Sequence, residues 1–115
     1  MSDIQELISK IIKFRDARDW KQFHNPKDSA IALSLESSEV LEQFLWLTKE
    51  EMEAYVKKHK KELGDELSDV LFWVLLMSYD LKIDIVKAFN SKMRQNNKKY
   101  SVKKAKGRHT KYTQL

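Results

Sequence analysis

Apolar residues recur at helical spacing along most of the chain, and this pattern predicts four helices. The first runs from about Asp3 to Arg18 and carries isoleucine and leucine residues at steps of three and four. Ser2, followed three residues later by Gln5, is typical of a capping box at a helix start. The pattern therefore predicts a first helix with one apolar stripe.

A short aromatic segment, DWKQFHN from Asp19 to Asn25, follows this helix. It ends at Pro26, a residue that suits the first turn of a new helix. We interpret the segment as a loop. Its Trp20, Phe23 and His24 either plug the core, which is the commoner use of such residues, or form a wall that faces a ligand.

The second predicted helix runs from about Pro26 to Leu47, and its centre, AIALSLESSEVLEQFLWL, is apolar or small nearly all round. A helix of that kind is expected to be buried. Two acids nevertheless lie in the middle of it, Glu36 and Glu39.

The third predicted helix runs from about Lys49 to Leu81, and Thr48 with Glu51 forms a second capping box at its start. The first half, through Lys61, is charged and expected to be exposed. The second half, ELSDVLFWVLLMSYDL, is apolar and expected to be buried, with a kink at Gly64 between the halves.

The last predicted helix runs from Asp84 to about Lys99, and no regular structure is expected beyond Tyr100. We therefore predict an all-α fold with a four-helix domain over residues 1–100 and a basic tail over 101–115. Scarce glycine (2) and proline (1) suit long helices. The second helix and the later half of the third are apolar on more than one face, which favours a dimer or a dimer of dimers.

Charge and composition narrow the possible partners. The net charge is +5, and much of the excess lies after Tyr100, where a basic segment either attracts anions or is a solvated tail. Without cysteine there is no disulfide and no thiolate chemistry. The longest uncharged apolar run, Val70 to Met77, is far below the roughly 20 residues that span a bilayer. The start lacks signal-peptide organisation, so no membrane association and a cytoplasmic location are expected.

Two acidic pairs carry the strongest chemical signal. Glu36 and Glu39 are three residues apart, as are Glu66 and Asp69, so each pair shares one helix face. Four carboxylates on neighbouring antiparallel helices would repel one another unless a divalent cation neutralised them. Ligation by oxygen alone favours Mg²⁺ or Mn²⁺, and Mg²⁺ commonly binds carboxylates together with substrate phosphates.

Two other interpretations compete with this metal site. Each acid could be an ordinary surface residue or salt-bridge partner, because 22 basic residues are available. A zinc site is disfavoured because His24, His59 and His109 are too scattered for a ligand spacing. A Walker loop is excluded, since neither glycine lies in the required pattern.

The segments LESSEVLEQFLW and DELSDVLFWVL look like the ExxE…ExxD signature of the all-α nucleoside triphosphate pyrophosphatases. RDWKQFH, SKMRQNNKKY and the terminal KYTQL resemble the dCTP pyrophosphatase branch of the MazG-like family. The resemblance covers the chain from about Asp16 onward. It implies an oligomeric four-helix enzyme that uses Mg²⁺ to hydrolyse a deoxynucleoside triphosphate, dCTP or a relative, between the α- and β-phosphates.

The resemblance also implies roles for individual residues. Glu36, Glu39, Glu66 and Asp69 match the metal-binding catalytic acids, and Glu39 is a candidate general base. The positions that match substrate contacts, the last two contributing to a neighbouring subunit, are Trp20, Lys21, Gln22, Phe23, His24, Trp46, Trp73, Asn96, Lys99, Tyr100, Lys111 and Tyr112.

Several alternatives stay open at this point. Trp46 and Trp73, at helical spacing, could be core residues rather than ligand contacts. Two positions depart from the resembled pattern, since Ile11 stands where related eukaryotic enzymes have a histidine and Trp73 replaces a tyrosine. The substrate could then be dUTP or a modified nucleotide. A non-catalytic helical module that binds nucleotides, or nucleic acid through its basic tail, is a further hypothesis, although no nucleic-acid motif is recognisable.

Overall fold

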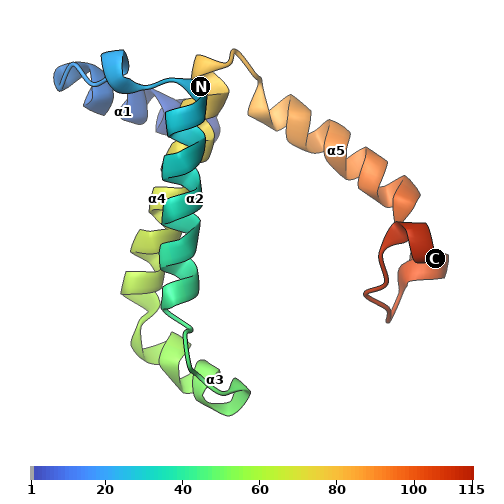
Figure 1. Cartoon of the computed structure of the whole chain (residues 1–115). Helices are drawn as coiled ribbons and strands as arrows, with labels where there is room; N and C mark the ends of the chain where they lie inside the picture. The colour runs from blue at the N-terminus through green and yellow to red at the C-terminus, as the bar shows by residue number, and fades with distance from the viewer. Residues whose placement is uncertain (1) are drawn as a thin grey trace. The chain divides into compact units, whose positions relative to one another are not determined.

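The computed structural model describes residues 2–115, and within that range it contains helices and turns but no strand. The all-α prediction is therefore confirmed. Figure 1 shows the elements in chain order: α1 Asp3–Ala17, the 3₁₀ turn η1 Lys21–Phe23, α2 Pro26–Glu42, α3 Lys49–Lys58, α4 Lys60–Asp80, α5 Ile85–Lys99, α6 Val102–Ala105 and the 3₁₀ turn η2 Tyr112–Gln114.

The chain forms two compact units, one ending at Lys82 and the other running from Ile83 to Leu115. In the first unit, α2 and α4 lie side by side and antiparallel (Figure 1), and α1 packs against α4. The small core contains Leu63, Leu75 and Leu76, which are at most 8% exposed. The α2–α4 pair is the frame that positions the acidic residues of the candidate site.

The predicted helix starts are confirmed. The Ser2 hydroxyl accepts a hydrogen bond from the Gln5 backbone N–H, and the Gln5 side chain accepts one from the Ser2 backbone. Thr48 and Glu51 form the same reciprocal pair at the start of α3. These caps satisfy backbone donors that have no partner within the helix.

The predicted end of the second helix is wrong. α2 stops at Glu42 rather than Leu47, and residues 43–46 form a tight turn. The backbone N–H groups of Gln43, Phe44 and Leu45 donate to carbonyls three residues back, which closes the chain more tightly than an α-helix. Trp46 then adopts a left-handed conformation with φ 68°.

The third predicted helix is two helices, and the break lies at His59 rather than at Gly64. Contacts between elements account for the break: the Tyr55 hydroxyl donates to the Gln43 side chain, and the Tyr55 ring lies 4.1 Å from the stacked His59 ring. This docking of α3 against the turn that follows α2 accompanies the change of direction before α4. Gly64 lies inside the regular first turns of α4.

The expectation of no regular structure beyond Tyr100 is also wrong. α6 and η2 both lie there, and the backbone N–H groups of Lys104 and Ala105 donate to the Ser101 carbonyl. The Tyr112 ring packs edge-on against Tyr100 at 5.9 Å and lies 4.6 Å from the Lys99 ammonium. Aromatic packing and a cation–π contact thus order this basic segment.

The expected burial of the second helix does not occur within one chain. Ile31, Leu35 and Leu41 of α2 are 49%, 62% and 68% exposed, and Leu67 of α4 is 57% exposed. An apolar face therefore remains uncovered on the first unit. No helix among the described residues is long and apolar enough to cross a membrane.

Candidate metal and nucleotide site

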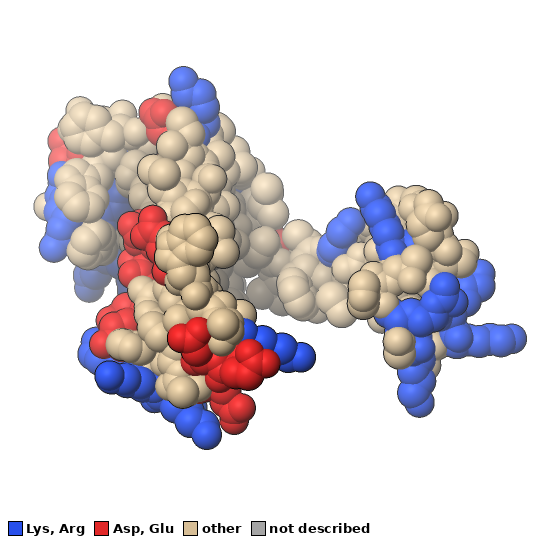
Figure 2. Space-filling view, turned by 60° about the horizontal axis from the view of Figure 1, so that its bottom comes forward, with Lys and Arg blue, Asp and Glu red and all other residues tan. Residues whose placement is uncertain are grey.

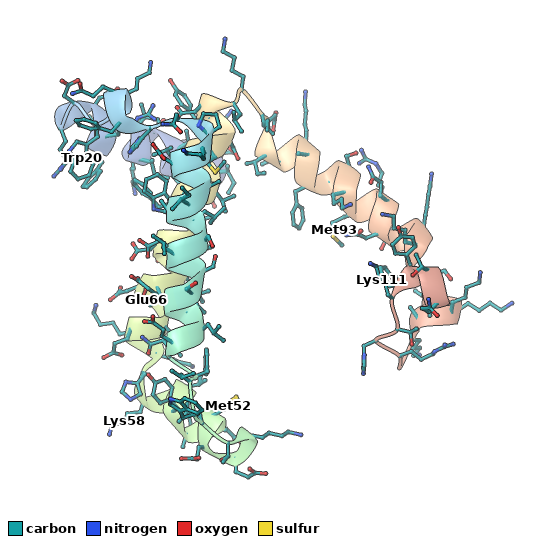
Figure 3. The ribbon with its side chains drawn as sticks, viewed as in Figure 1. Trp20, Met52, Lys58, Glu66, Met93 and Lys111 are labelled. Carbon is teal, nitrogen blue, oxygen red and sulfur yellow. The ribbon has the colours of Figure 1, made fainter. Side chains whose placement is uncertain are left out.

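Four carboxylates converge on the α2–α4 pair. Because the two helices run antiparallel, the later half of α2, with Glu36 and Glu39, lies beside the early half of α4, with Glu66 and Asp69. One carboxylate oxygen from each of the four residues lies within 4.8 Å of the others. Figure 3 shows Glu66 projecting from α4 in this region.

Burial and contacts with neighbouring carboxylates raise the pKa of two of these acids. The pKa of Glu36 is raised from 4.5 to about 6, first by burial, then by a hydrogen bond shared with Glu39 and by the neighbouring charges. The pKa of Glu66 is also raised, first by its hydrogen bond to Glu39, then by burial and the surrounding carboxylates. The neighbouring carboxylates thus oppose the ionisation of Glu36 and Glu66.

The donor set fits a hard divalent cation. The Oε2 atoms of Glu36 and Glu66 are buried and have no hydrogen-bond partner. A buried carboxylate oxygen without a partner is costly, and a bound cation would satisfy both atoms at once. All four candidate ligands offer oxygen, the donor that Mg²⁺ and Mn²⁺ prefer.

The cluster is open to solvent on one side. Glu39 and Asp69 are exposed, whereas Glu36 and Glu66 are partly buried, so the expectation that both pairs lie wholly inside buried stretches is wrong. Figure 2 shows acidic side chains at several places on the surface of the first unit. An ion and a polyphosphate can therefore reach the carboxylates directly from water.

An aromatic cavity of about 480 Å³ adjoins the acids at Asp69. Four rings follow one another along it: Trp20 lies 5.6 Å from Phe14, Phe14 lies 6.2 Å from Phe72, and Phe72 lies 5.3 Å from Trp73, all edge-on. Its residues are Lys10, Ile11, Phe14, Trp20, Asp69, Phe72 and Trp73. Aromatic walls of this kind suit a flat heterocyclic base.

The aromatic loop is divided between two cavities. Trp20 lines the cavity beside Asp69, whereas Lys21 and His24 line a separate cavity of about 260 Å³ near the start of α2. Gln22 donates to the Asp19 carbonyl, and Phe23 is 64% exposed. Of the five loop residues that the sequence associates with substrate, only Trp20 lines the cavity that also contains Asp69.

Trp46 and Trp73 have different surroundings. Trp73 lines the aromatic cavity one helical turn beyond Asp69, as a ligand contact would. Trp46 is 90% exposed in its left-handed turn, so it is not a core residue of this chain. The core interpretation of Trp46 is wrong.

The other predicted contacts, Asn96, Lys99, Tyr100, Lys111 and Tyr112, belong to the second unit. Within it, Lys99 and Tyr100 both contact the Tyr112 ring, and the Asn96 carbonyl accepts from the Tyr100 backbone. Residues 83–115 contain ten Lys or Arg and one acid, Asp84. Figure 2 shows the basic side chains spread over this unit, which suits binding of a phosphate-bearing ligand.

Sequence reasoning missed three cavity residues, Lys10, Phe14 and Phe72. Lys10 and Phe14 are four residues apart and share one face of α1, while Phe72 follows Asp69 by three positions on α4. Of the three, only Phe72 could have been predicted from the sequence, because its spacing of three residues from Asp69 places it beside the acidic face of α4. The approach of α1 depends on tertiary packing.

Comparisons with known proteins agree with this geometry. The MazG-like family model matches residues 31–115. dCTP pyrophosphatase 1 of Rattus norvegicus is 35% identical over 117 residues, spanning 100% of this chain and 67% of the relative. The Homo sapiens protein of the same name is 33% identical with the same coverage. A crystal structure of a pyrophosphatase from Archaeoglobus fulgidus superposes with a TM-score of 0.83 at 32% identity, covering 88% of this chain and 94% of that one.

The fold, the acidic cluster and these likenesses define an all-α nucleoside triphosphate pyrophosphatase. The chain belongs to the MazG-like family, as its motifs predict. It is accordingly an enzyme that acts on a nucleotide, and the hypothesis of a non-catalytic module is not supported.

Proposed function

We propose that this enzyme hydrolyses deoxynucleoside triphosphates, with dCTP or a related deoxynucleotide as substrate, to a nucleoside monophosphate and pyrophosphate in a Mg²⁺-dependent reaction. Such an activity would cleanse or balance the nucleotide pool. The observation that carries the proposal is the convergence of four carboxylates beside an aromatic cavity. The names of the relatives at 33–35% identity support the choice of dCTP.

Glu36, Glu39, Glu66 and Asp69 would hold Mg²⁺, or Mn²⁺ in its place. When bound, the ion supplies positive charge for the triphosphate and polarises a phosphoryl oxygen. The partnerless Oε2 atoms of Glu36 and Glu66 support this assignment, because no protein donor satisfies them.

Glu39 is the strongest candidate for the general base. Its carboxyl lies within 4.8 Å of those of Glu36 and Glu66, and it remains exposed on the open side of the cluster. A water that attacks the α-phosphorus would arrive from that side and could transfer its proton to the Glu39 carboxylate.

The aromatic cavity would hold the base. Trp20 and Trp73 offer ring surfaces beside Asp69, so a base bound there would leave its triphosphate near the carboxylates. Both positions that depart from the resembled pattern, Ile11 and Trp73, line this cavity. Their side chains would therefore set the preference between dCTP and other substrates such as dUTP or modified nucleotides.

The active form would be a dimer or a dimer of dimers. Ile31, Leu35, Leu41 and Leu67 are each about half exposed or more on α2 and α4, and a second copy would bury them. The basic residues of the second unit, among them Lys99 and Lys111, would then contribute to phosphate binding with Asn96, Tyr100 and Tyr112, in the same or a neighbouring subunit.

A panel of nucleoside triphosphates tests the proposal through Mg²⁺-dependent release of pyrophosphate. Glu36→Gln and Asp69→Asn should fold and lose activity by at least about a hundredfold, because each removes one ligand charge. Glu42→Gln is the matched control, since it removes an exposed α2 carboxylate outside the cluster. Full activity in either cluster variant would contradict the site.

A further inference from the structure

An ion pair between buried Arg15 and partly exposed Asp80 takes no part in the proposed chemistry. Arg15, in the last turn of α1, is only 1% exposed. Its Nη1 donates to both carboxylate oxygens of Asp80, at 3.0 and 2.8 Å, and so joins the end of α1 to the end of α4. A fully buried guanidinium is costly unless it is paired, and Asp80 supplies the partner here.

The same Nη1 atom lies 3.5 Å from Nδ1 of His24. A guanidinium can only donate hydrogen bonds, so His24 Nδ1 has to accept, and its proton resides on Nε2. The pKa of His24 is lowered, first by burial and then by the Arg15 charge, against an opposing effect of Asp80. Arg15 thus holds His24 in one neutral tautomer and one orientation.

His24 in turn contacts the cavity wall. Its ring packs edge-on against Trp73, with the ring centres 5.3 Å apart and the planes at 74°. Trp73 lines the cavity beside Asp69, whereas His24 lines the separate 260 Å³ cavity with Asp80. A chain of contacts therefore runs from Asp80 through Arg15 and His24 to Trp73.

We propose that Arg15, held by Asp80, is a positioning residue that fixes His24 and thereby the face that Trp73 presents to the nucleotide base. This inference rests on the proposed function, because it assumes that a base occupies the aromatic cavity. The Arg15 side chain has no hydrogen bond or ion pair with the four acids, so we expect its effect to fall on nucleotide binding and not on the chemical step.

The decisive variant replaces the pair with apolar residues of similar length, Arg15→Met with Asp80→Leu. Such a replacement leaves no charge without a partner at the buried Arg15 position, whereas removal of Asp80 alone would leave the guanidinium unpaired. The backbone bond from Trp20 N–H to the Arg15 carbonyl, 3.2 Å long, survives the change, so only the His24 branch is altered. Arg15→Lys is the second variant, which retains the charge but loses the planar guanidinium geometry.

We expect KM for dCTP to rise about tenfold in the double variant while kcat stays within about twofold, the pattern of lost binding that is common to ground and transition states. Inorganic tripolyphosphate, which has no base, should inhibit wild type and variant equally. Arg15→Lys should also raise KM for dCTP. In a His24→Phe background, the double replacement should raise KM by much less than in wild type, because its effect passes through His24.

Three results would overturn the positioning role: an unchanged KM, an equal weakening of dCTP and tripolyphosphate, or full additivity with His24→Phe. Wild-type turnover is measured separately and tests the proposed function alone. Tryptophan fluorescence titration with dCMP measures Kd without turnover, and the ratio of the variant Kd to the wild-type Kd reports the change in base binding. A change in that ratio supports the positioning role even if hydrolysis of dCTP is not found, and a constant ratio contradicts it.

Discussion

Replacing Glu36 by Gln should stabilise the metal-free enzyme while it impairs metal binding and catalysis. Glutamine keeps the size of the side chain and removes one charge from a group of four carboxylates within 4.8 Å. The pKa of Glu36 is raised from 4.5 to about 6, mainly by burial and by its contacts with Glu39. Its ionised form is therefore held in the folded protein at a cost in free energy.

The sign and size of this cost follow from proton linkage. Since the folded pKa, about 6, exceeds the unfolded value of 4.5, the folded state binds more protons between these pH values. Wild-type stability consequently falls as pH rises through that window, and the penalty is complete above it. The shift corresponds to at most about 2 kcal/mol, and solvent screening at a partly exposed group reduces it to about 1 kcal/mol.

Thermal unfolding in EDTA measures the effect. Near pH 7.5, Glu36→Gln should unfold roughly 4–8 °C above wild type, and the difference should vanish near pH 4.5, where the wild-type carboxyl is protonated. Added Mg²⁺ should stabilise wild type more than the variant. Glu42→Gln should match wild type both in its unfolding temperature in EDTA and in its stabilisation by Mg²⁺. A variant that is destabilised in EDTA, or shifted equally at both pH values, would refute the electrostatic reasoning.

The remaining predictions concern the cavity, the oligomer and the second unit. Trp20→Ala should raise KM for dCTP by about ten- to a hundredfold, the range expected for one lost base-stacking contact, with unchanged tripolyphosphate inhibition as its control. Leu35→Glu should dissociate the assembly, because Leu35 is 62% exposed in the single chain, and light scattering that shows wild type already monomeric would contradict this. Asp84→Ala should reduce stability by about 1 kcal/mol, because the carboxylate accepts from the Lys87 N–H at the start of α5; circular dichroism that shows unchanged helix melting would count against it.

Local signals in the sequence were sufficient for helix type and for most helix starts. Ser2 with Gln5 and Thr48 with Glu51 form their capping boxes within four residues, so no distant partner is needed. The ExxE and ExxD spacings place each acidic pair on one helix face for the same reason. Their convergence followed from the antiparallel packing of neighbouring helices.

Features that depend on contacts between elements were not predictable. The break at His59 reflects the docking of Tyr55 onto Gln43, and no pattern within α3 or α4 encodes that contact. The cavity likewise arises only where Phe14 of α1 meets Phe72 of α4. Burial of α2 was overestimated because an apolar pattern cannot distinguish a face that the same chain covers from one that it leaves exposed.

One measurement tests the central claim, that four clustered carboxylates hold a cation for cleavage between the α- and β-phosphates. ³¹P NMR of dCTP incubated with enzyme and Mg²⁺ identifies the products directly. We predict pyrophosphate and dCMP with wild type and Glu42→Gln, and intact dCTP with Glu36→Gln or after addition of EDTA. Formation of dCDP with inorganic phosphate, or the same products with and without Glu36, would contradict the assignment.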